Sequence, residues 1–240
     1  MQHDAFELLA AAERDHWWFR GRREFIAAAI ERAGLPASAQ ILDAGCGSGG
    51  NLPLLSQYGG VHGFEFDAHA ADRAASLRVG TVNRGSLPDH IPFGAKRFDL
   101  IGLFDVLEHL EHPVESLAAL RERLADGGAI LISVPAYPWL WGPHDELHQH
   151  FRRYTAGSLE AHLTAAGLRV EYLSYFNSLL LPLAVAQRLR ERFFGYAVAD
   201  LTPSNAMNDV LLRIWRMERL WIPRWRAPFG LSLLAIARRR

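Results

Sequence analysis

The stretch Gln40–Asn51, which reads QILDAGCGSGGN, decides the fold of this chain. Its first residues are apolar, as in a short buried strand, and glycines follow at positions 45, 47 and 49. Glycine has no Cβ, so the backbone can turn sharply there and a ligand can lie directly on it. A helix is expected to begin with Asn51–Leu55, and its first N–H groups can face a polar ligand. Strand, glycine turn and helix together form the nucleotide-binding corner of an open α/β sheet.

An acidic residue in this turn distinguishes between ligands. Gly45, Gly47 and Gly50 also satisfy the G-x-G-x-x-G fingerprint of dinucleotide-binding oxidoreductases, which is one alternative; a turn without any ligand is another. The carboxylate of Asp43 would repel a pyrophosphate and suits a ligand with an ammonium or sulfonium charge. The sequence LDAGCGSG resembles the first motif of class I S-adenosylmethionine-dependent methyltransferases. This resemblance implies S-adenosyl-L-methionine as the cofactor.

Several residues are expected to contact that cofactor. Glu65 follows Gly45 by about 20 residues, the distance at which an acid ending the second strand reaches ribose hydroxyls. Similar methyltransferases commonly hold the adenine amino group with an acid where this chain has Ser86, and Leu87 can pack on the ring. Cys46 is the single cysteine and is expected to be a small packing residue of the turn. The expected cofactor-binding residues are Asp43, Gly45, Cys46, Gly47, Gly49, Asn51, Glu65, Phe66, Ser86, Leu87 and Phe104.

Composition favours a globular protein without a nucleic-acid partner. The chain has 240 residues, half of them hydrophobic, and a formal net charge of zero, so no overall field attracts nucleic acid. Many methyltransferases that act on nucleobases or amides carry a DPPY- or NPPY-type motif after the fourth strand, where this chain reads FDVL from Phe104. No signal-peptide pattern is present, and the most apolar window is too short to span a bilayer. We expect a cytoplasmic protein that at most lies on a membrane.

Alternating strand and helix patterns predict a parallel sheet with helices on both faces. Similar methyltransferases end in an antiparallel pair of strands, so we expect a Rossmann-like, seven-stranded α/β sheet that is mostly parallel with an antiparallel last strand. Residues 1–240 are expected to form a single domain, made of an N-terminal helical cap (1–36), a core (37–177), a helical insertion (178–228) and a final strand with its tail (229–240). Further strands are expected at 61–65, 81–84, 98–104, 129–134, 168–175 and 230–236, and helices at 4–33, 68–77, 113–124 and 155–166.

The first candidate catalytic residue is His109, beside Glu108 after the fourth strand. Methyl transfer depends mainly on holding the acceptor in line with the methyl carbon, and a general base is needed only when the acceptor arrives protonated. The segment Asp105-x-x-Glu108-His109 also resembles an arrangement in some ubiquinone-pathway O-methyltransferases, where a divalent metal helps to activate a catechol. A metal site, a metal-free polar role and structural capping all remain open.

The second candidate is His148, in the segment 135–154 that follows the fifth strand. This segment mixes aromatic and titratable side chains, as an acceptor pocket requires, and a histidine there can take a hydroxyl proton. His144, His148 and His150 can alternatively bind zinc, although their spacing matches no strong ligand pattern. A loop packed by its own aromatic side chains is the structural alternative. With the HWWF segment at 16–19, residues 135–154 loosely resemble a bacterial subgroup of small-molecule methyltransferases.

Two flanking segments place arginines among aromatic residues. The first segment contains Trp17, Trp18 and Phe19. These rings either dock their helix on the sheet or cover the cofactor, and in the second case a nearby arginine can meet an acidic group of the substrate. Residues 178–228 carry an amphipathic basic surface that suits anionic lipid, a lid over the pocket or the pairing of two subunits. We therefore interpret the chain as an S-adenosylmethionine-dependent methyltransferase for a small-molecule or lipid-like acceptor, methylated on oxygen. The alternative is a non-catalytic Rossmann-like scaffold that binds partners through residues 178–228.

Overall fold

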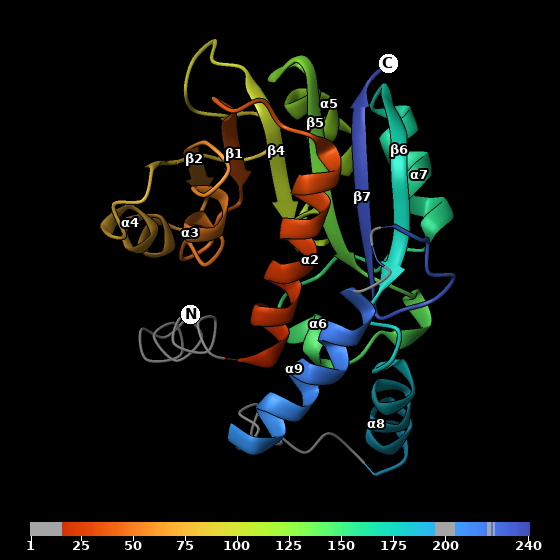
Figure 1. Cartoon of the computed structure of the whole chain (residues 1–240). Coiled ribbons are helices and arrows are strands. Elements are labelled where there is room, and N and C mark those ends of the chain that lie inside the picture. Colours follow the sequence, from red (N-terminus) through yellow and green to blue (C-terminus); the bar gives the residue numbers. More distant parts are fainter. Residues whose placement is uncertain (1–15, 195–204, 220–221, 223) are drawn as a thin grey trace.

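The computed structural model describes residues 16–194, 205–219, 222 and 224–240 (Figure 1). The strands within these residues are β1 (Gln40–Ala44), β2 (Gly60–Glu65), β3 (Thr81–Arg84), β4 (Phe98–Phe104), β5 (Leu124–Pro135), β6 (Leu168–Phe176) and β7 (Ser232–Arg239). In this described part they form one seven-stranded sheet in the order β3-β2-β1-β4-β5-β7-β6. The neighbours from β3 to β5 pair in parallel, whereas β7 is antiparallel to both β5 and β6. This confirms the predicted Rossmann-like sheet with its antiparallel last strand.

Helices cover both faces of the sheet. Their bounds are α2 (Trp17–Ala33), α3 (Leu52–Leu55), α4 (Ala68–Ser76), α5 (Pro113–Arg121), α6 (Pro143–Leu147), α7 (Ala156–Ala165), α8 (Leu181–Phe194) and α9 (Asn205–Arg219), with short 3₁₀ turns η1 (Leu107–His109) and η2 (Pro138–Leu140). Figure 1 shows α2 crossing one face, with α5 and α7 toward the other. Side chains cap two of these helices: Asp67 accepts from the Ala70 N–H, and Thr155 accepts from the Ser158 N–H.

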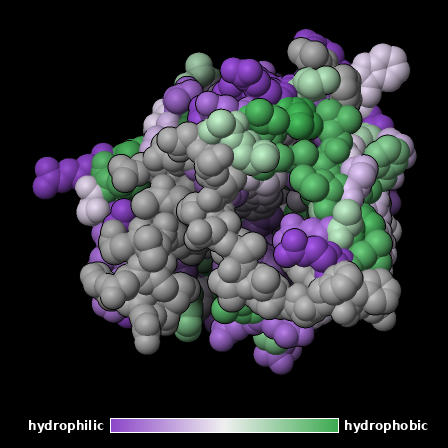
Figure 2. Space-filling model, turned by 90° about the horizontal axis from the view of Figure 1, so that it is seen from below, coloured by the Kyte–Doolittle hydropathy of each residue, from purple (hydrophilic) through white to green (hydrophobic). Residues whose placement is uncertain are grey.

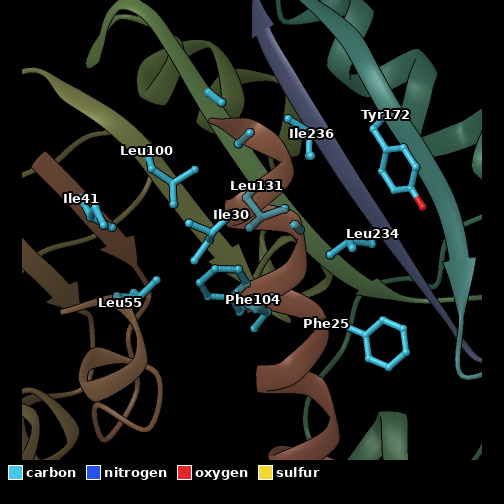
Figure 3. Packing of buried hydrophobic residues seen from close by; sticks show 14 of the residues in the cluster. Phe25, Ile30, Ile41, Leu55, Leu100, Phe104, Leu131, Tyr172, Leu234 and Ile236 are labelled. Atoms are coloured by element: carbon cyan, nitrogen blue, oxygen red, sulfur yellow. The ribbon is translucent and has the colours of Figure 1, made fainter. Parts of the chain in front are cut away.

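Two hydrophobic cores lie on the two faces of the sheet, because successive side chains of a strand point to opposite sides. In β4, Leu100 and Phe104 join the core under α2, whereas Ile101 and Leu103 join the core beneath α5 and α7. Figure 3 shows Ile30 of α2 among the strand residues of the first core. Burying each such side chain contributes about 1.5–3 kcal/mol, so the strands, and the loops that follow them, are held firmly in place.

The structure corrects several predicted element boundaries: the helix predicted at 113–124 ends at Arg121, and the last strand spans Ser232–Arg239 rather than 230–236. The helix after the glycine turn is only the single turn α3, so it offers few N–H groups to a ligand. The fifth strand begins at Leu124 rather than at residue 129, because Leu124 pairs with Phe98 before the register shifts and Ala129 pairs with Leu100. Gly127 has a φ of 76° in this irregular stretch, which glycine adopts without strain. Residues 4–15 of the predicted first helix lie outside the described residues.

The N-terminal helix packs on the insertion through aromatic rings. Trp215 of α9 is fully buried, and its ring centroid lies 5.3 Å from that of Trp17 and 6.3 Å from that of Trp18. An ion pair of 2.7 Å joins Glu24 of α2 to Arg216 of α9. The aromatic segment of α2 therefore docks against the insertion helix, which supports the proposal that residues 1–240 form one domain. None of the helices in the described part is long and apolar enough to cross a bilayer.

Candidate functional site

The glycine turn after β1 is built around positive φ angles. Gly45, Gly47 and Gly49 have φ values of 75°, 54° and 89°, a region that other residues rarely adopt. A Cβ added at Gly45 would lie only 2.8 Å from Cγ2 of Val106, so side chains at this position are also excluded by packing. A Cβ added at Gly47 would meet no atom within 4 Å. The turn therefore presents open backbone on which a ligand can lie.

Glu65 closes this turn from the neighbouring strand. Its Oε2 accepts from the Gly47 N–H at 3.0 Å, and its Oε1 accepts from the N–H groups of Phe66 at 2.8 Å and Asp67 at 3.0 Å. Each carboxylate oxygen has about two acceptor sites, so Oε2 keeps capacity for a hydroxyl group of a ligand. Asn51, at the end of the turn, is buried, and its Oδ1 has no partner among the described residues. Open backbone, a carboxylate and a buried amide fit a nucleoside with ribose hydroxyls.

The sequence suggested that the two acids of the loop after β4, Asp105 and Glu108, could share one helical face. The structure shows that they do not. Asp105 has a φ of 56° and precedes the 3₁₀ turn that contains Glu108 and His109. Its carboxylate forms an ion pair with Arg22 of α2, whose guanidinium also lies 4.8 Å from the ring centroid of Trp18. The predicted arginine of the N-terminal segment thus meets an acid of the protein itself. In the metal alternative that the sequence left open, Asp105 is therefore not available as a ligand beside Glu108 and His109.

Glu108 and His109 instead meet the loop that follows β5. The Phe151 N–H donates to the Glu108 carbonyl at 2.8 Å, and the ring of His109 stands nearly perpendicular to that of His150, with 4.6 Å between centroids. Glu108 is buried, and burial, followed by the nearby charge of Asp105, raises the pKa of its carboxyl well above the usual value. Loss of hydration, followed by the neighbouring His150 and His148, lowers the pKa of His109.

Asp145 is the centre of the histidine cluster, and sequence reasoning missed it. This fully buried carboxylate accepts from the Gly142 N–H at 2.9 Å, from His150 Nδ1 at 2.9 Å and from Arg153 Nε at 2.7 Å. Burial alone would raise the pKa of Asp145, but hydrogen bonds from His150 and Arg153 lower it overall. The available signal was two adjacent acids, Asp145 and Glu146, among three histidines within seven residues, a pattern without periodicity.

Both predicted catalytic histidines lie in this cluster. The ring centroid of His109 lies 4.6 Å from that of His150, and the ring centroid of His148 lies 4.3 Å from that of His144 and 6.1 Å from that of His150. Burial, followed by the neighbouring His150, lowers the pKa of His148. The structure therefore brings His109 and His148 together at the carboxyl edge of the sheet, the edge where open α/β sheets bind ligands.

The family of the chain follows from a sequence comparison. A family model described as a methyltransferase domain matches residues 18–173. The chain belongs to this methyltransferase family. A probable S-adenosylmethionine-dependent methyltransferase from Mycolicibacterium smegmatis is 30% identical over 164 residues, which cover 65% of this chain and 61% of the relative. The chain thus spans less than two thirds of that relative.

Solved structures of methyltransferases share the fold. A TehB-like enzyme from Corynebacterium glutamicum matches with a TM-score of 0.56 and 20% identity, over 91% of this chain and 88% of that one. Phosphoethanolamine N-methyltransferase 2 from Haemonchus contortus, solved with S-adenosyl-L-methionine, matches with a TM-score of 0.59 and 16% identity, over 88% and 51%. At these identities the likeness extends to the fold. The family match assigns the chain to the methyltransferases and not to the dinucleotide-binding oxidoreductases.

The other residues expected at the methyltransferase cofactor differ in exposure. Asp43 and Cys46 are buried beneath the turn, as a packing role of the cysteine requires, while Phe66 at the end of β2 is 74% exposed. The ring of Phe104 is buried in the core against Gly102, so only its backbone is available to the cofactor. Ser86 forms two backbone hydrogen bonds with His90, at 2.8 and 2.9 Å, in the loop after β3, and Leu87 packs partly against the second core.

Proposed function

We propose that this enzyme transfers the methyl group of S-adenosylmethionine to a hydroxyl oxygen of a small-molecule or lipid-like acceptor. The observation that carries this proposal is the histidine cluster around Asp145, which lies beside His109 at the carboxyl edge. A hydroxyl must lose its proton during methylation, whereas an amine with a free lone pair needs no such help. His109 and His148 remain our candidates for catalytic residues: the ring of His148 can hydrogen-bond the acceptor hydroxyl, and His109 lies in the same cluster, beside His150.

The apolar surface near this edge supports a lipid-like acceptor. Figure 1 places α6, α8 and α9 at the end of the molecule toward which β4 points, and Figure 2 shows apolar side chains gathered on the face seen from that end. Exposed arginines, among them Arg190 and Arg213, accompany them and suit anionic headgroups. We propose that this surface contacts an anionic membrane from which the acceptor is drawn. Its exposed apolar residues include Leu183, Leu189, Met207, Val210 and Met217.

A labelling experiment tests the acceptor class. A bacterial lysate is incubated with the purified enzyme and S-adenosylmethionine labelled in its methyl group, and is then extracted into organic and aqueous phases. We expect enzyme-dependent label in the organic phase, and sedimentation of the enzyme with phosphatidylglycerol vesicles but not with phosphatidylcholine vesicles. Label found only in nucleic acid or protein would refute the proposal. Label in small aqueous products would restrict the acceptor to soluble molecules. If the enzyme forms dimers and does not sediment with either kind of vesicle, the apolar surface serves subunit pairing instead.

We propose that Glu65 binds the ribose hydroxyls of the cofactor. The Glu65→Ala substitution is expected to weaken the binding of S-adenosylmethionine by about 1–2 kcal/mol, since charge-assisted hydrogen bonds are lost. Isothermal titration calorimetry measures this change. The matched control is Asp67→Ala, which removes the neighbouring acid and the cap of α4 but leaves Glu65 in place, and its affinity should equal that of the native enzyme. Equal losses in the two variants would show that the ribose contact is assigned wrongly.

A further inference from the structure

Three side chains from two separate loops converge at the carboxyl edge of the sheet. Glu108 and His109 come from the 3₁₀ turn after β4, and His150 comes from the loop after β5. One oxygen of Glu108 and one ring nitrogen from each histidine lie within 4.8 Å of one another. Ligands of a tetrahedral zinc ion, with bonds of about 2.1 Å, sit roughly 3.4 Å apart. Small rotations of the side chains are therefore enough to bring all three onto one ion.

One of the two imidazoles is already oriented by a partner outside this group. His150 uses Nδ1 to contact Asp145, so its Nε2 remains available as a ligand. Histidines that bind metals in proteins are typically held in this way by a carboxylate or a backbone carbonyl. Asp145 is in turn fixed by hydrogen bonds from Arg153 and Gly142. The ring of His109 stands nearly perpendicular to that of His150, with 4.6 Å between their centroids.

Glu108 provides an independent indication of a cation. It is only 1% exposed, and its Oε2 has no hydrogen-bond partner in the described part of the chain. A buried carboxyl oxygen without a partner is costly unless a cation or a proton satisfies it. Asp105 does not compete for the same ion, because its carboxylate is paired with Arg22.

We infer that Glu108, His109 and His150 bind a divalent transition-metal ion of the zinc class. Two imidazoles and one carboxylate form a set that proteins use for catalytic zinc, and they leave a fourth position open. The set differs from both combinations that the sequence suggested: Asp105 is replaced by His150, and His144 and His148 are not ligands. If the proposed function is right, an ion here would polarise the acceptor hydroxyl, but its binding does not depend on that function.

Metal titration of the complete protein tests this site. The enzyme is stripped with a chelator and titrated with Zn²⁺ by calorimetry and with Co²⁺ by visible absorption, without cofactor or acceptor. We expect one ion per chain and the intense d–d bands of a four-coordinate Co²⁺ site. His109→Ala should weaken binding by more than the roughly 10–100-fold lost with an outer-shell partner. Circular dichroism checks that this variant folds normally, and Glu108→Gln provides a second test of the same set.

The neighbouring histidines provide matched controls. His144→Ala and His148→Ala each remove an imidazole from the same cluster and leave Glu108, His109 and His150 in place. Both variants should bind Zn²⁺ with an affinity within about threefold of the native value. This change is smaller than the roughly 10–100-fold loss expected when an outer-shell partner of a ligand is removed. Failure of the native protein to bind either ion, or equal losses in the His144 and His109 variants, would overturn the inference. Metal binding without label transfer to any hydroxyl acceptor would refute only the proposed function.

Discussion

The Asp145→Ala substitution is expected to destabilise the enzyme by about 3–5 kcal/mol, the typical cost of removing one partner from a buried ion pair. Asp145 is fully buried, and the side chain of Arg153 is only 9% exposed, so water cannot replace the lost carboxylate. The Gly142 N–H and His150 Nδ1 lose their acceptor in the same step. The loop 142–153 carries most of the histidine cluster, so this loop should loosen first.

Urea denaturation followed by circular dichroism measures this loss. The matched control is Glu146→Ala, which removes the adjacent, exposed acid of α6 and should change the free energy of unfolding by less than about 0.5 kcal/mol. Adding Arg153→Met to the Asp145→Ala variant should recover part of the stability, because it removes the unpaired buried charge. A loss below about 1 kcal/mol in the single variant would contradict the role of Asp145 as the centre of the cluster.

The parts of this molecule that were predicted from the sequence depend on local spacing. The glycine turn follows from the positions of Gly45, Gly47 and Gly49, because positive φ angles require glycine within a few residues of the strand. The position of Glu65 follows from the length of one β-α-β unit, which sets where the second strand ends. Its hydrogen bond to Gly47 spans only 18 residues of sequence. Signals of this kind do not depend on how distant segments pack.

The parts that were missed depend on contacts between distant segments. Arg22 and Asp105 are 83 residues apart, and no pattern near either residue indicates the other. The pairing of Glu108 and His109 with His150 likewise depends on a backbone hydrogen bond between two loops. The early start of β5 depends on pairing with β4, which overrode the helical pattern up to residue 124. Each of these three features is determined by tertiary packing between distant segments, which a single sequence does not reveal.

The Trp215→Ala substitution is expected to destabilise the enzyme by about 3–5 kcal/mol through the cavity that it leaves. Trp215 is fully buried where α2, α9 and the end of β6 meet, and its ring stacks near Phe176 and Phe25, with centroids 6.3 and 6.0 Å away. A Cβ added to Gly21 would lie 2.3 Å from the Trp215 ring, so α2 and α9 are in very close contact there.

Thermal and urea denaturation of the complete enzyme measure this effect. Met217→Ala is the matched control on the same helix, since its side chain is 54% exposed and its loss should cost less than about 0.5 kcal/mol. The loss of stability in Trp215→Phe should lie between those of Trp215→Ala and Met217→Ala, because phenylalanine keeps one aromatic ring in the cluster. If the insertion packed only loosely on the core, Trp215→Ala would unfold with the native midpoint, and α9 would then be an appendage that contributes nothing to the domain.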